Sequence, residues 1–413
     1  MRTTSLRAIF AIAGSCALAC ATACDSSPSG GGGGPPGADV PGGGEDTNPE
    51  AVSPPGETGG PTQPTSPGPV TAPGDAAVQF IGRFETTDPA GPKASWPGAR
   101  IVARFHGTSV SATMREFAWD WMVDAAPSYW EYTIDGGPPT VLPMVADDSP
   151  HVYELASNLP AGEHLVELYK RSEMQTGVTQ FLGYDLHGGT LLAPPPRKTR
   201  HIEAMADSYG TGYGIEKLDA PNLSCGVDHA GVFQNFRKAW PQVLADRFDA
   251  EIEGTVYSGK GLTKGKWPTD VDGLIDYYGR SNPDPARQND PPLFDLKSWI
   301  PDVIVLVQGT VDNGIADFRN VYRDFVVNQL RARAPNAHIL LVVPGYVARD
   351  KFIDVVHSVA RERNEAGDLR VYPVVPNMEE PEEMTGCGFH GNPAYHQRIA
   401  KELGDVIAEK AGW

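Results

Sequence analysis

The sequence has 413 residues, enough for about two or three domains, and its 40% hydrophobic and 21% charged residues are typical of soluble globular domains. Its formal net charge of −18 argues against nucleic-acid binding, because contact with a phosphate backbone needs clustered Lys and Arg. The same charge would repel the chain from anionic lipid, so we expect contact with a membrane only through an anchor. No zinc-ribbon, EF-hand or P-loop spacing occurs, so the sequence gives no support for the metal and nucleotide chemistries of those motifs.

The first 24 residues have the pattern of a secretory signal peptide. Arg2 and Arg7 form a positive region, and an apolar stretch over 6–23 leads to Cys24. The Ala-Thr-Ala-Cys sequence that ends there resembles a bacterial lipobox, although Ala21 stands where Leu is usual. We therefore expect an exported protein whose Cys24 carries a lipid anchor, in the periplasm or at the cell surface. Plain secretion is the alternative.

Residues 25–75 are dominated by Gly and Pro, with Ser, Thr, Asp and Glu between them. Since this segment has no periodic apolar face, no core can offset the entropy lost on ordering it. We predict a disordered linker. A long tether behind an anchor suits a domain that must reach a polymer.

Residues 76–195 predict a β-sandwich. Short runs of alternating apolar and polar residues are separated by turn signals such as Asp135-Gly136-Gly137, a spacing typical of two packed antiparallel sheets. The predicted strands cover 78–82, 100–105, 109–113, 130–134 and 164–169. An aromatic cluster with Trp119 and Trp121 suits either core packing or a surface that stacks on sugar rings.

Residues 196–413 alternate between strand and helix patterns, which predicts a parallel sheet with helices on both faces. The predicted strands cover 201–206, 252–257, 302–307, 338–343 and 369–375. The predicted helical stretches cover 232–244, 321–330, 352–359 and 397–410. Ligands of such sheets bind beyond the carboxyl ends of the strands, so the residues that follow each strand are candidates for chemistry.

Ser208 follows the first of these strands directly and lies among glycines, which makes it a candidate nucleophile. Gly259 follows the second strand, where its lack of a side chain lets a backbone amide approach a ligand. His390 precedes the last helix and is a candidate general base. Because all three lie at equivalent edges of one sheet, we expect them to converge.

Four blocks of sequence resemble those of the SGNH (GDSL) hydrolases in order. They are Asp-Ser-x-x-x-Gly-Tyr-Gly from Asp207, Ser-Gly-Lys-Gly from Ser258, Gly-Thr-x-Asp from Gly309 and His-x-Asn-Pro from His390. Upstream stretches such as Phe80-Ile-Gly-Arg-Phe84 make the chain most similar to carbohydrate esterase family 2. This resemblance implies a jelly-roll-type β-sandwich followed by an α/β SGNH domain with a five-stranded parallel sheet in flavodoxin-like order. It also implies removal of O-acetyl groups from polysaccharides such as xylan and glucomannan, without metal or cofactor.

Carried over by position, the resemblance implies that Ser208 is the nucleophile and His390 its base, with the amides of Ser208 and Gly259 forming the oxyanion hole. Three positions depart from the family pattern. Ala206 replaces a Gly, Val311 replaces the Asn that would donate to the oxyanion, and Cys387 replaces an Asp that orients the histidine. The nearest substitutes for the lost amide are Asn313 and then Gln308, and Glu382 or Glu383 could help to orient His390.

Cys225 and Cys387 are the two cysteines of the folded part. Because an exported protein can form disulfides, we hypothesise a bond between them that braces the His390 loop. Tyr209 and Trp267 flank the expected cleft and are candidates for stacking on a sugar ring, with packing as the alternative.

The remaining polar residues near the cleft suggest structural roles. We expect His396 to be a structural hydrogen-bonding residue and Asp207 and Asp312 to anchor loops. We expect Lys260 to lie on an exposed loop, with contact to substrate as the alternative. We expect a monomer that meets an acetylated polysaccharide. Two other functions remain open: a surface lipoprotein that binds glycan without turnover, and an esterase for another acyl group or for an envelope polymer.

Overall fold

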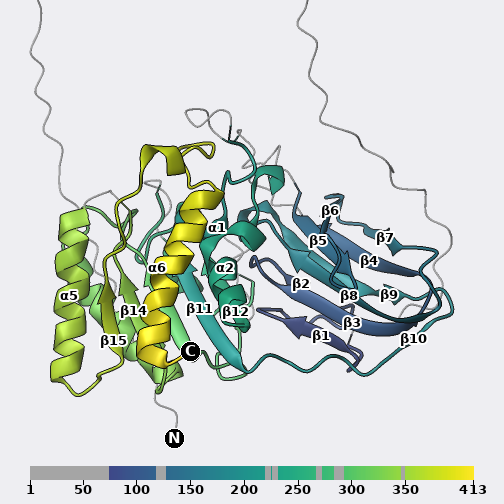
Figure 1. Cartoon of the computed structure of the whole chain (residues 1–413), viewed down its shortest axis with the longest axis horizontal. Coiled ribbons are helices and arrows are strands. Elements are labelled where there is room, and N and C mark those ends of the chain that lie inside the picture. Colours follow the sequence, from purple (N-terminus) through teal and green to yellow (C-terminus); the bar gives the residue numbers. More distant parts are fainter. Residues whose placement is uncertain are drawn as a thin grey trace, which may run out of the picture. The chain divides into compact units, whose positions relative to one another are not determined.

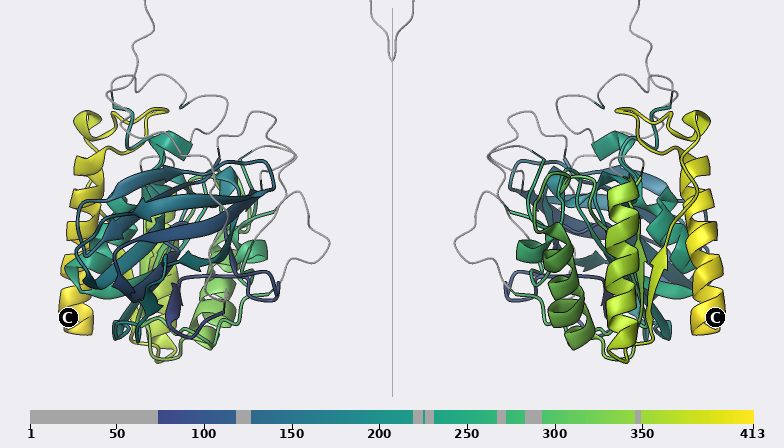
Figure 2. Two further views of the ribbon diagram at one scale, coloured as in Figure 1. Left: turned by 90° about the vertical axis from the view of Figure 1, so that its right-hand side faces the viewer. Right: turned by 90° about the vertical axis from the view of Figure 1, so that its left-hand side faces the viewer.

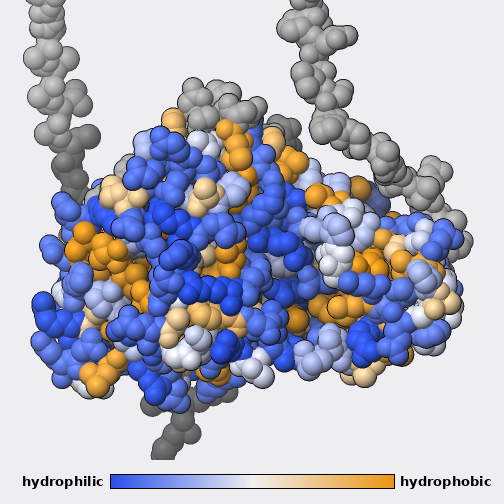
Figure 3. Space-filling view, viewed as in Figure 1, coloured by the Kyte–Doolittle hydropathy of each residue, from blue (hydrophilic) through white to orange (hydrophobic). Residues whose placement is uncertain are grey.

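The computed structural model describes residues 74–117, 127–218, 225, 231–266, 272–282, 293–345 and 349–413. The predicted signal peptide, lipid anchor at Cys24 and linker to residue 73 lie outside these residues, as do Trp119, Trp121 and Trp267. Within the described ranges, no helix is both long and apolar enough to cross a membrane. The face drawn in Figure 3 is mostly polar, and its apolar side chains form separate patches.

The N-terminal region contains two antiparallel sheets that share one hydrophobic core (Figure 1). Every second residue of a strand faces this core, because successive side chains point to opposite faces of a sheet. Ile101 and Phe105 enter it from one sheet, and Ala112 and Met114 enter it from the other. The first sheet has the order β1 (Val78–Ile81), β3 (Arg100–Gly107), β8 (Gly162–Lys170), β5 (Tyr129–Ile134), β6 (Thr140–Pro143), with β10 (Thr190–Leu191) also on β3. The second has the order β2 (Lys93–Ala94), β9 (Val178–Asp185), β4 (Val110–Phe117), β7 (Pro150–Ala156).

All five strands predicted in this region are present, as β1, β3, β4, β5 and β8. Strands β2, β6, β7, β9 and β10 were not predicted from the sequence. Three of them are short, and the longer β9 is buried along nearly all of its length. It therefore lacks the alternation by which a half-exposed strand is recognised.

The C-terminal region is built on a five-stranded parallel sheet, as predicted. Its strands are β11 (Arg200–Ala206), β12 (Ala250–Val256), β13 (Val303–Val307), β14 (His338–Val342) and β15 (Val371–Val374), each within two residues of its predicted ends. The order β12-β11-β13-β14-β15 corresponds to 2-1-3-4-5 in this sheet, which is the flavodoxin-like arrangement.

Helices cover both faces of the parallel sheet (Figures 1 and 2). On one face, Ile202 and Ala204 of β11 pack in a core with α2 (Trp240–Arg247) and α6 (Pro393–Ala411). On the other, Met205 packs in a core with α4 (Phe318–Phe325) and α5 (Arg349–Glu365). A π-helical turn, Val326–Arg331, continues α4, and α1 (Ser208–Thr211) and α3 (Leu274–Tyr277) are single turns. Because both faces are buried, β13 and β14 are almost entirely apolar, whereas β11 and β12 carry the buried Glu203 and Glu253.

The helix predicted over 232–244 is wrong in its first half. The structure has 3-10 turns at Gly231–Phe233 and Phe236–Lys238, and α2 begins only at Trp240. Asn235 is extended and caps the second turn by accepting from the Arg237 amide. Ala239 is also extended and is followed closely by Pro241, which has no amide hydrogen to donate into a preceding turn.

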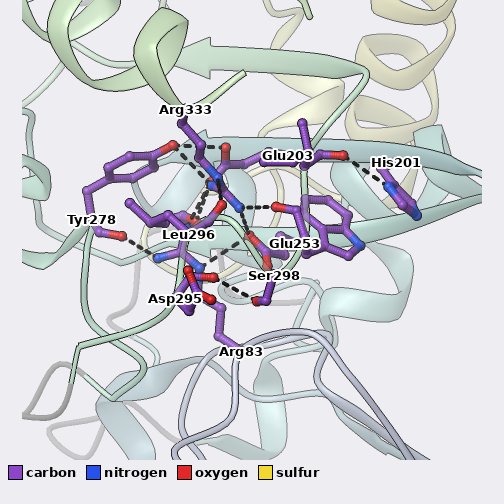
Figure 4. Close-up of polar contacts among 12 residues, drawn as sticks. Arg83, His201, Glu203, Glu253, Tyr278, Asp295, Leu296, Ser298 and Arg333 are labelled. Carbon is purple, nitrogen blue, oxygen red and sulfur yellow. Dashed lines mark hydrogen bonds and ion pairs between the residues drawn. The ribbon is translucent and has the colours of Figure 1, made fainter. Parts of the chain in front are cut away.

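A buried cluster of two arginines and two glutamates joins the N-terminal sheets to the parallel sheet (Figure 4). Glu203 and Glu253 are neighbours in register on β11 and β12. Arg83, from the N-terminal region, lies 2.9 Å from Glu203 and 3.3 Å from Glu253. Arg333 lies 2.6 Å and 3.0 Å from the same two carboxylates. All four side chains are at most 2% exposed, so each charge depends on the others for compensation.

Candidate active site

The strand order predicts one ligand crevice at the carboxyl end of the parallel sheet. The chain reverses direction across the sheet between β11 and β13, because β12 lies on one side of β11 and β13 on the other. Ligands of open parallel sheets bind at such a switch point. Ser208 follows β11, and residues 308–313 follow β13, so both segments border this crevice.

Ser208 begins the single turn α1, and Asp207 is its cap. The Asp207 carboxyl accepts from the Tyr209 amide at 3.1 Å, so it anchors the loop as expected. Burial raises the pKa of Asp207 to about 6. The Ser208 side chain is half-buried and remains accessible to a ligand.

His390 lies against Ser208, although 182 residues separate them in the chain. Its Nε2 atom is 2.8 Å from the Ser208 hydroxyl, and its Nδ1 atom is 3.2 Å from the carbonyl oxygen of Cys387. A carbonyl oxygen can only accept a hydrogen bond, so the proton of the neutral ring belongs on Nδ1. Nε2 is then free to accept the hydroxyl proton of Ser208, which is the arrangement of a nucleophile and its general base.

The surroundings of His390 favour its neutral form. Desolvation by the surrounding protein lowers its pKa to about 4, against the raising effect of the backbone carbonyls of Cys387 and Gly388. The positive charge of Lys266 contributes to the lowering. A neutral imidazole is the form that can take a proton from serine.

The loop that carries His390 is closed at both ends. Gly386 and His390 exchange backbone hydrogen bonds of 2.9 and 3.2 Å, and the Cys387 amide donates to the carbonyl of Lys217. Cys387 forms a disulfide with Cys225, the pair that we hypothesised from the sequence. Immediately after the loop, Asn392 caps α6 by accepting from the amides of the residues two and three positions later.

The loop after β12 is held close to the same crevice. Gly259 has a φ of +74°, a left-handed conformation that residues with a side chain rarely adopt. The buried carboxylate of Asp312 accepts from the amides of Leu262 and Thr263 at 2.7 and 2.9 Å. Asp312 therefore ties this loop to the segment after β13, the anchoring role expected of it.

The other predicted site residues differ in their distance from His390 and in their exposure. The Tyr209 ring lies 5.5 Å from the His390 ring, and that of Tyr213 lies 4.6 Å from it. Asn313 is exposed, Val311 is half-buried, and Gln308 is buried with its side-chain oxygen unpaired among the described residues.

His396 has the structural role predicted for it, since its Nδ1 accepts from the Trp240 amide at 3.1 Å. The expectation for Lys260 is wrong: it is 5% exposed, and its ammonium group packs over the rings of Tyr257 and Tyr277. The long aliphatic stem of a lysine suits such burial against rings. Glu383 pairs with Arg398 at 2.7 Å.

Two residues with a possible part in the site were missed by the sequence analysis. Phe389 precedes His390, has a φ of +55° and is 55% exposed, an unusual combination for a large apolar side chain. Glu173 comes from the N-terminal region and bonds to Ser258. No local pattern marks Glu173, but an aromatic residue beside a candidate base was visible in the sequence.

Among the described residues, no group of three or more His, Cys, Asp or Glu side chains is arranged to hold a metal ion. The arrangement at the crevice is that of a serine nucleophile, a histidine base and nearby loop amides. These groups are suited to acyl transfer.

Comparison with known proteins agrees with this chemistry. Residues 80–196 match the family model described as Carbohydrate esterase 2 N-terminal. The chain is 29% identical over 345 residues to the cellulase/esterase CelE of Acetivibrio thermocellus, covering 81% of this chain but only 40% of that protein. It is 26% identical to an acetylxylan esterase / glucomannan deacetylase of Cellvibrio japonicus, covering 82% of this chain and 90% of that protein.

Solved structures are similar over the same region. A family two carbohydrate esterase from Clostridium thermocellum, in complex with cellohexaose, has a TM-score of 0.71 at 27% identity, covering 81% of this chain and 99% of that one. A family two carbohydrate esterase from Cellvibrio japonicus has a TM-score of 0.71 at 26% identity, covering 83% and 98%. The sequence blocks, the fold and these relatives agree: residues 80–196 match the N-terminal family model, and the chain is similar to carbohydrate esterases of family 2.

Proposed function

We propose that the protein is a serine esterase that removes O-acetyl groups from a polysaccharide of the xylan or glucomannan type. The observation that carries this proposal is the 2.8 Å contact between His390 Nε2 and the Ser208 hydroxyl at the switch point of the sheet. The names of the Cellvibrio relatives and the cellohexaose complex of the clostridial relative support a carbohydrate substrate.

The reaction proceeds in two halves. Ser208 Oγ attacks the acetyl carbonyl while His390 Nε2 takes the hydroxyl proton, and the amides of Ser208 and Gly259 stabilise the oxyanion. His390 then gives the proton to the leaving sugar oxygen, which leaves an acetyl-Ser208 intermediate. Water, deprotonated by His390, attacks this ester, and acetate leaves as Ser208 regains its proton.

Asn313 is the side chain that we assign as the further oxyanion donor in place of the amide lost at Val311. Because Asn313 is exposed, its hydrogen bond competes with water and stabilises the oxyanion less than a buried donor would. This departure favours a second candidate function, a glycan-binding protein with weakened turnover. An esterase for another acyl group or an envelope polymer would use the same residues.

The setting of the enzyme belongs to the proposal. The N-terminal sheets form a jelly-roll-type β-sandwich, Cys24 carries a lipid anchor, and the linker extends the folded part as a monomer from the periplasmic or outer cell surface. Tyr209 stacks on the sugar that bears the acetyl group. Trp267 is assigned the same role.

The test is acetate release from acetylated xylan, with acetylated peptidoglycan and a small acetyl ester as comparison substrates. Wild-type protein should release acetate from xylan, and Ser208→Ala should abolish release. Retained xylan binding without acetate release from any substrate would favour the glycan-binding function. Release from peptidoglycan but not xylan would favour the envelope esterase.

A further inference from the structure

The carboxyl group of Glu173 belongs to the N-terminal region but holds the loop that follows β12. It accepts from the Ser258 amide at 2.8 Å, from the Ser258 hydroxyl at 2.7 Å and from the Gln234 side-chain amide at 2.9 Å. Glu173 is fully buried, so these bonds lie away from water. Hydrogen bonds to a buried carboxylate are among the stronger ones in proteins.

The neighbouring Gln175 completes the hold on Ser258. Its side-chain amide donates to the Ser258 carbonyl oxygen. The amide, hydroxyl and carbonyl of Ser258 are therefore all bound by residues 173–175. We call these two side chains, Glu173 and Gln175, the loop clamp.

Contacts continue from the loop clamp toward the nucleophile. The Ser258 hydroxyl lies 3.2 Å from the hydroxyl of Thr211, which in turn donates to the Ser208 carbonyl oxygen at 3.2 Å. Ser258 thus contacts both the clamp and the turn that carries Ser208. The next residue in the chain is Gly259, whose amide is assigned to the oxyanion hole.

We propose that Glu173 is a positioning residue, which fixes the Gly259 amide relative to Ser208 by binding Ser258. The inference rests on the proposed function, since it concerns the oxyanion hole of that reaction. Oxyanion donors act only when they lie within hydrogen-bond distance of the developing charge. A small displacement of the Gly259 amide therefore reduces the stabilisation of the transition state more than it reduces substrate binding.

The clamp also has a distinct electrostatic setting. The cation that faces Glu173 is Lys170, which is fully buried and bonds to the carbonyl oxygens of Ser172 and Glu173 at 3.3 and 3.5 Å. Tyr213 is a further titratable group that interacts with it. Burial raises the pKa of Glu173 to about 7, so its charge changes within the range in which His390 stays neutral.

The experiment compares Glu173→Gln with Glu116→Gln, a matched control. Glu116 is also fully buried, also faces Lys170 and accepts from the Ser128 amide and the Thr179 hydroxyl within the N-terminal sheets. On 4-nitrophenyl acetate, Glu173→Gln should lower kcat about 10- to 100-fold with KM nearly unchanged. Glu116→Gln should lower kcat by less than about 3-fold, since its bonds do not reach the loop.

Two further measurements separate positioning from general damage. The kcat of the wild-type protein should fall in part as pH falls through about 7, and this step should be missing in Glu173→Gln. Hydrogen exchange of the backbone amides of residues 258–262 should be faster in Glu173→Gln than in Glu116→Gln. If Glu173→Gln does not fold, Ser258→Ala should show the same kcat loss to a smaller degree, because the Ser258 amide still binds Glu173.

The inference would be overturned by an equal kcat loss in both glutamine variants, or by unchanged kcat and unchanged loop exchange in Glu173→Gln. A wild-type protein that hydrolyses no acetyl ester would instead refute the proposed function. The exchange comparison would then still decide whether Glu173 positions the loop.

Discussion

The carbonyl oxygen of Cys387 lies 3.2 Å from Nδ1 of His390. A neutral carbonyl sets the tautomer and direction of the ring, but it stabilises the imidazolium form less than a carboxylate does. The orientation of His390 therefore depends on the backbone of Cys387. That backbone is held by the Cys225 disulfide and by the bond to Lys217.

Removing the disulfide should impair both stability and turnover. The double substitution Cys225→Ala and Cys387→Ala should lower the free energy of unfolding by about 2–5 kcal/mol, and kcat should fall because the Cys387 carbonyl loses its support. Urea unfolding and ester hydrolysis below the unfolding transition measure the two effects. A reductant should lower the free energy of unfolding and kcat of the wild-type protein and leave both unchanged in the double variant. An unchanged kcat in the double variant would show that the loop does not need the bond.

The activity should persist well below the pH at which an ordinary histidine is protonated. At pH 5 a histidine with a pKa of about 6.5 is about 3% neutral, whereas one with a pKa of about 4 is about 90% neutral. In the Glu173→Gln variant, which lacks the step at about pH 7, the loss of kcat/KM should therefore occur as pH falls through about 4. The Glu173→Gln variant isolates this loss, and a main loss near pH 6.5 in that variant would contradict it.

Restoring the family amide should raise turnover. Val311→Asn places a donor on a half-buried side chain, where it competes less with water than the exposed Asn313. We expect kcat on a small acetyl ester to rise about 10-fold, with KM unchanged. Val311→Leu is the control for side-chain size and should give no gain. A folded Val311→Asn protein without a gain would mean that another group already fills this role.

Phe389 should contribute to polymer binding rather than to chemistry. Its ring is 55% exposed beside His390, so it offers an apolar face to a sugar. Phe389→Ala should raise KM for acetylated xylan about 10-fold and leave kcat on 4-nitrophenyl acetate nearly unchanged. Phe389→Gly should have the same KM as Phe389→Ala but a higher free energy of unfolding, because glycine adopts the positive φ without strain. Equal KM values for wild type and both variants would exclude the role.

Breaking the buried charge cluster should destabilise the protein strongly. Arg83→Ala leaves the buried Glu203 and Glu253 with Arg333 as their remaining arginine partner, so the free energy of unfolding should fall by about 3–5 kcal/mol. Arg104→Ala removes a partly exposed ion pair with Glu163 and should cost less than about 1 kcal/mol. Denaturant unfolding measures both. Similar losses in the two variants would refute the importance of the cluster.

The sequence alone was sufficient for the parallel sheet, because its strands, most clearly 303–307 and 339–342, are short apolar segments between helical patterns. It also indicated Ser208, Gly259 and His390, since residues after parallel strands meet at one edge. The helix over 232–244 was overpredicted because the spacing of its apolar residues outweighed the signals at Asn235 and Pro241. The prediction that Lys260 is exposed was wrong because its side chain is covered by the rings of Tyr257 and Tyr277, which only the folded chain brings to it.

What the sequence by itself determined is therefore the type of chemistry and the strands that present it. The tertiary structure decided how the groups are held: the Cys387 carbonyl behind His390, Asp312 on the loop after β12 and Glu173 on Ser258. These contacts join residues that are distant in the chain or use backbone atoms. Backbone atoms are the same in every residue, and a side chain far away in sequence carries no local signal, so no pattern along the chain could reveal them.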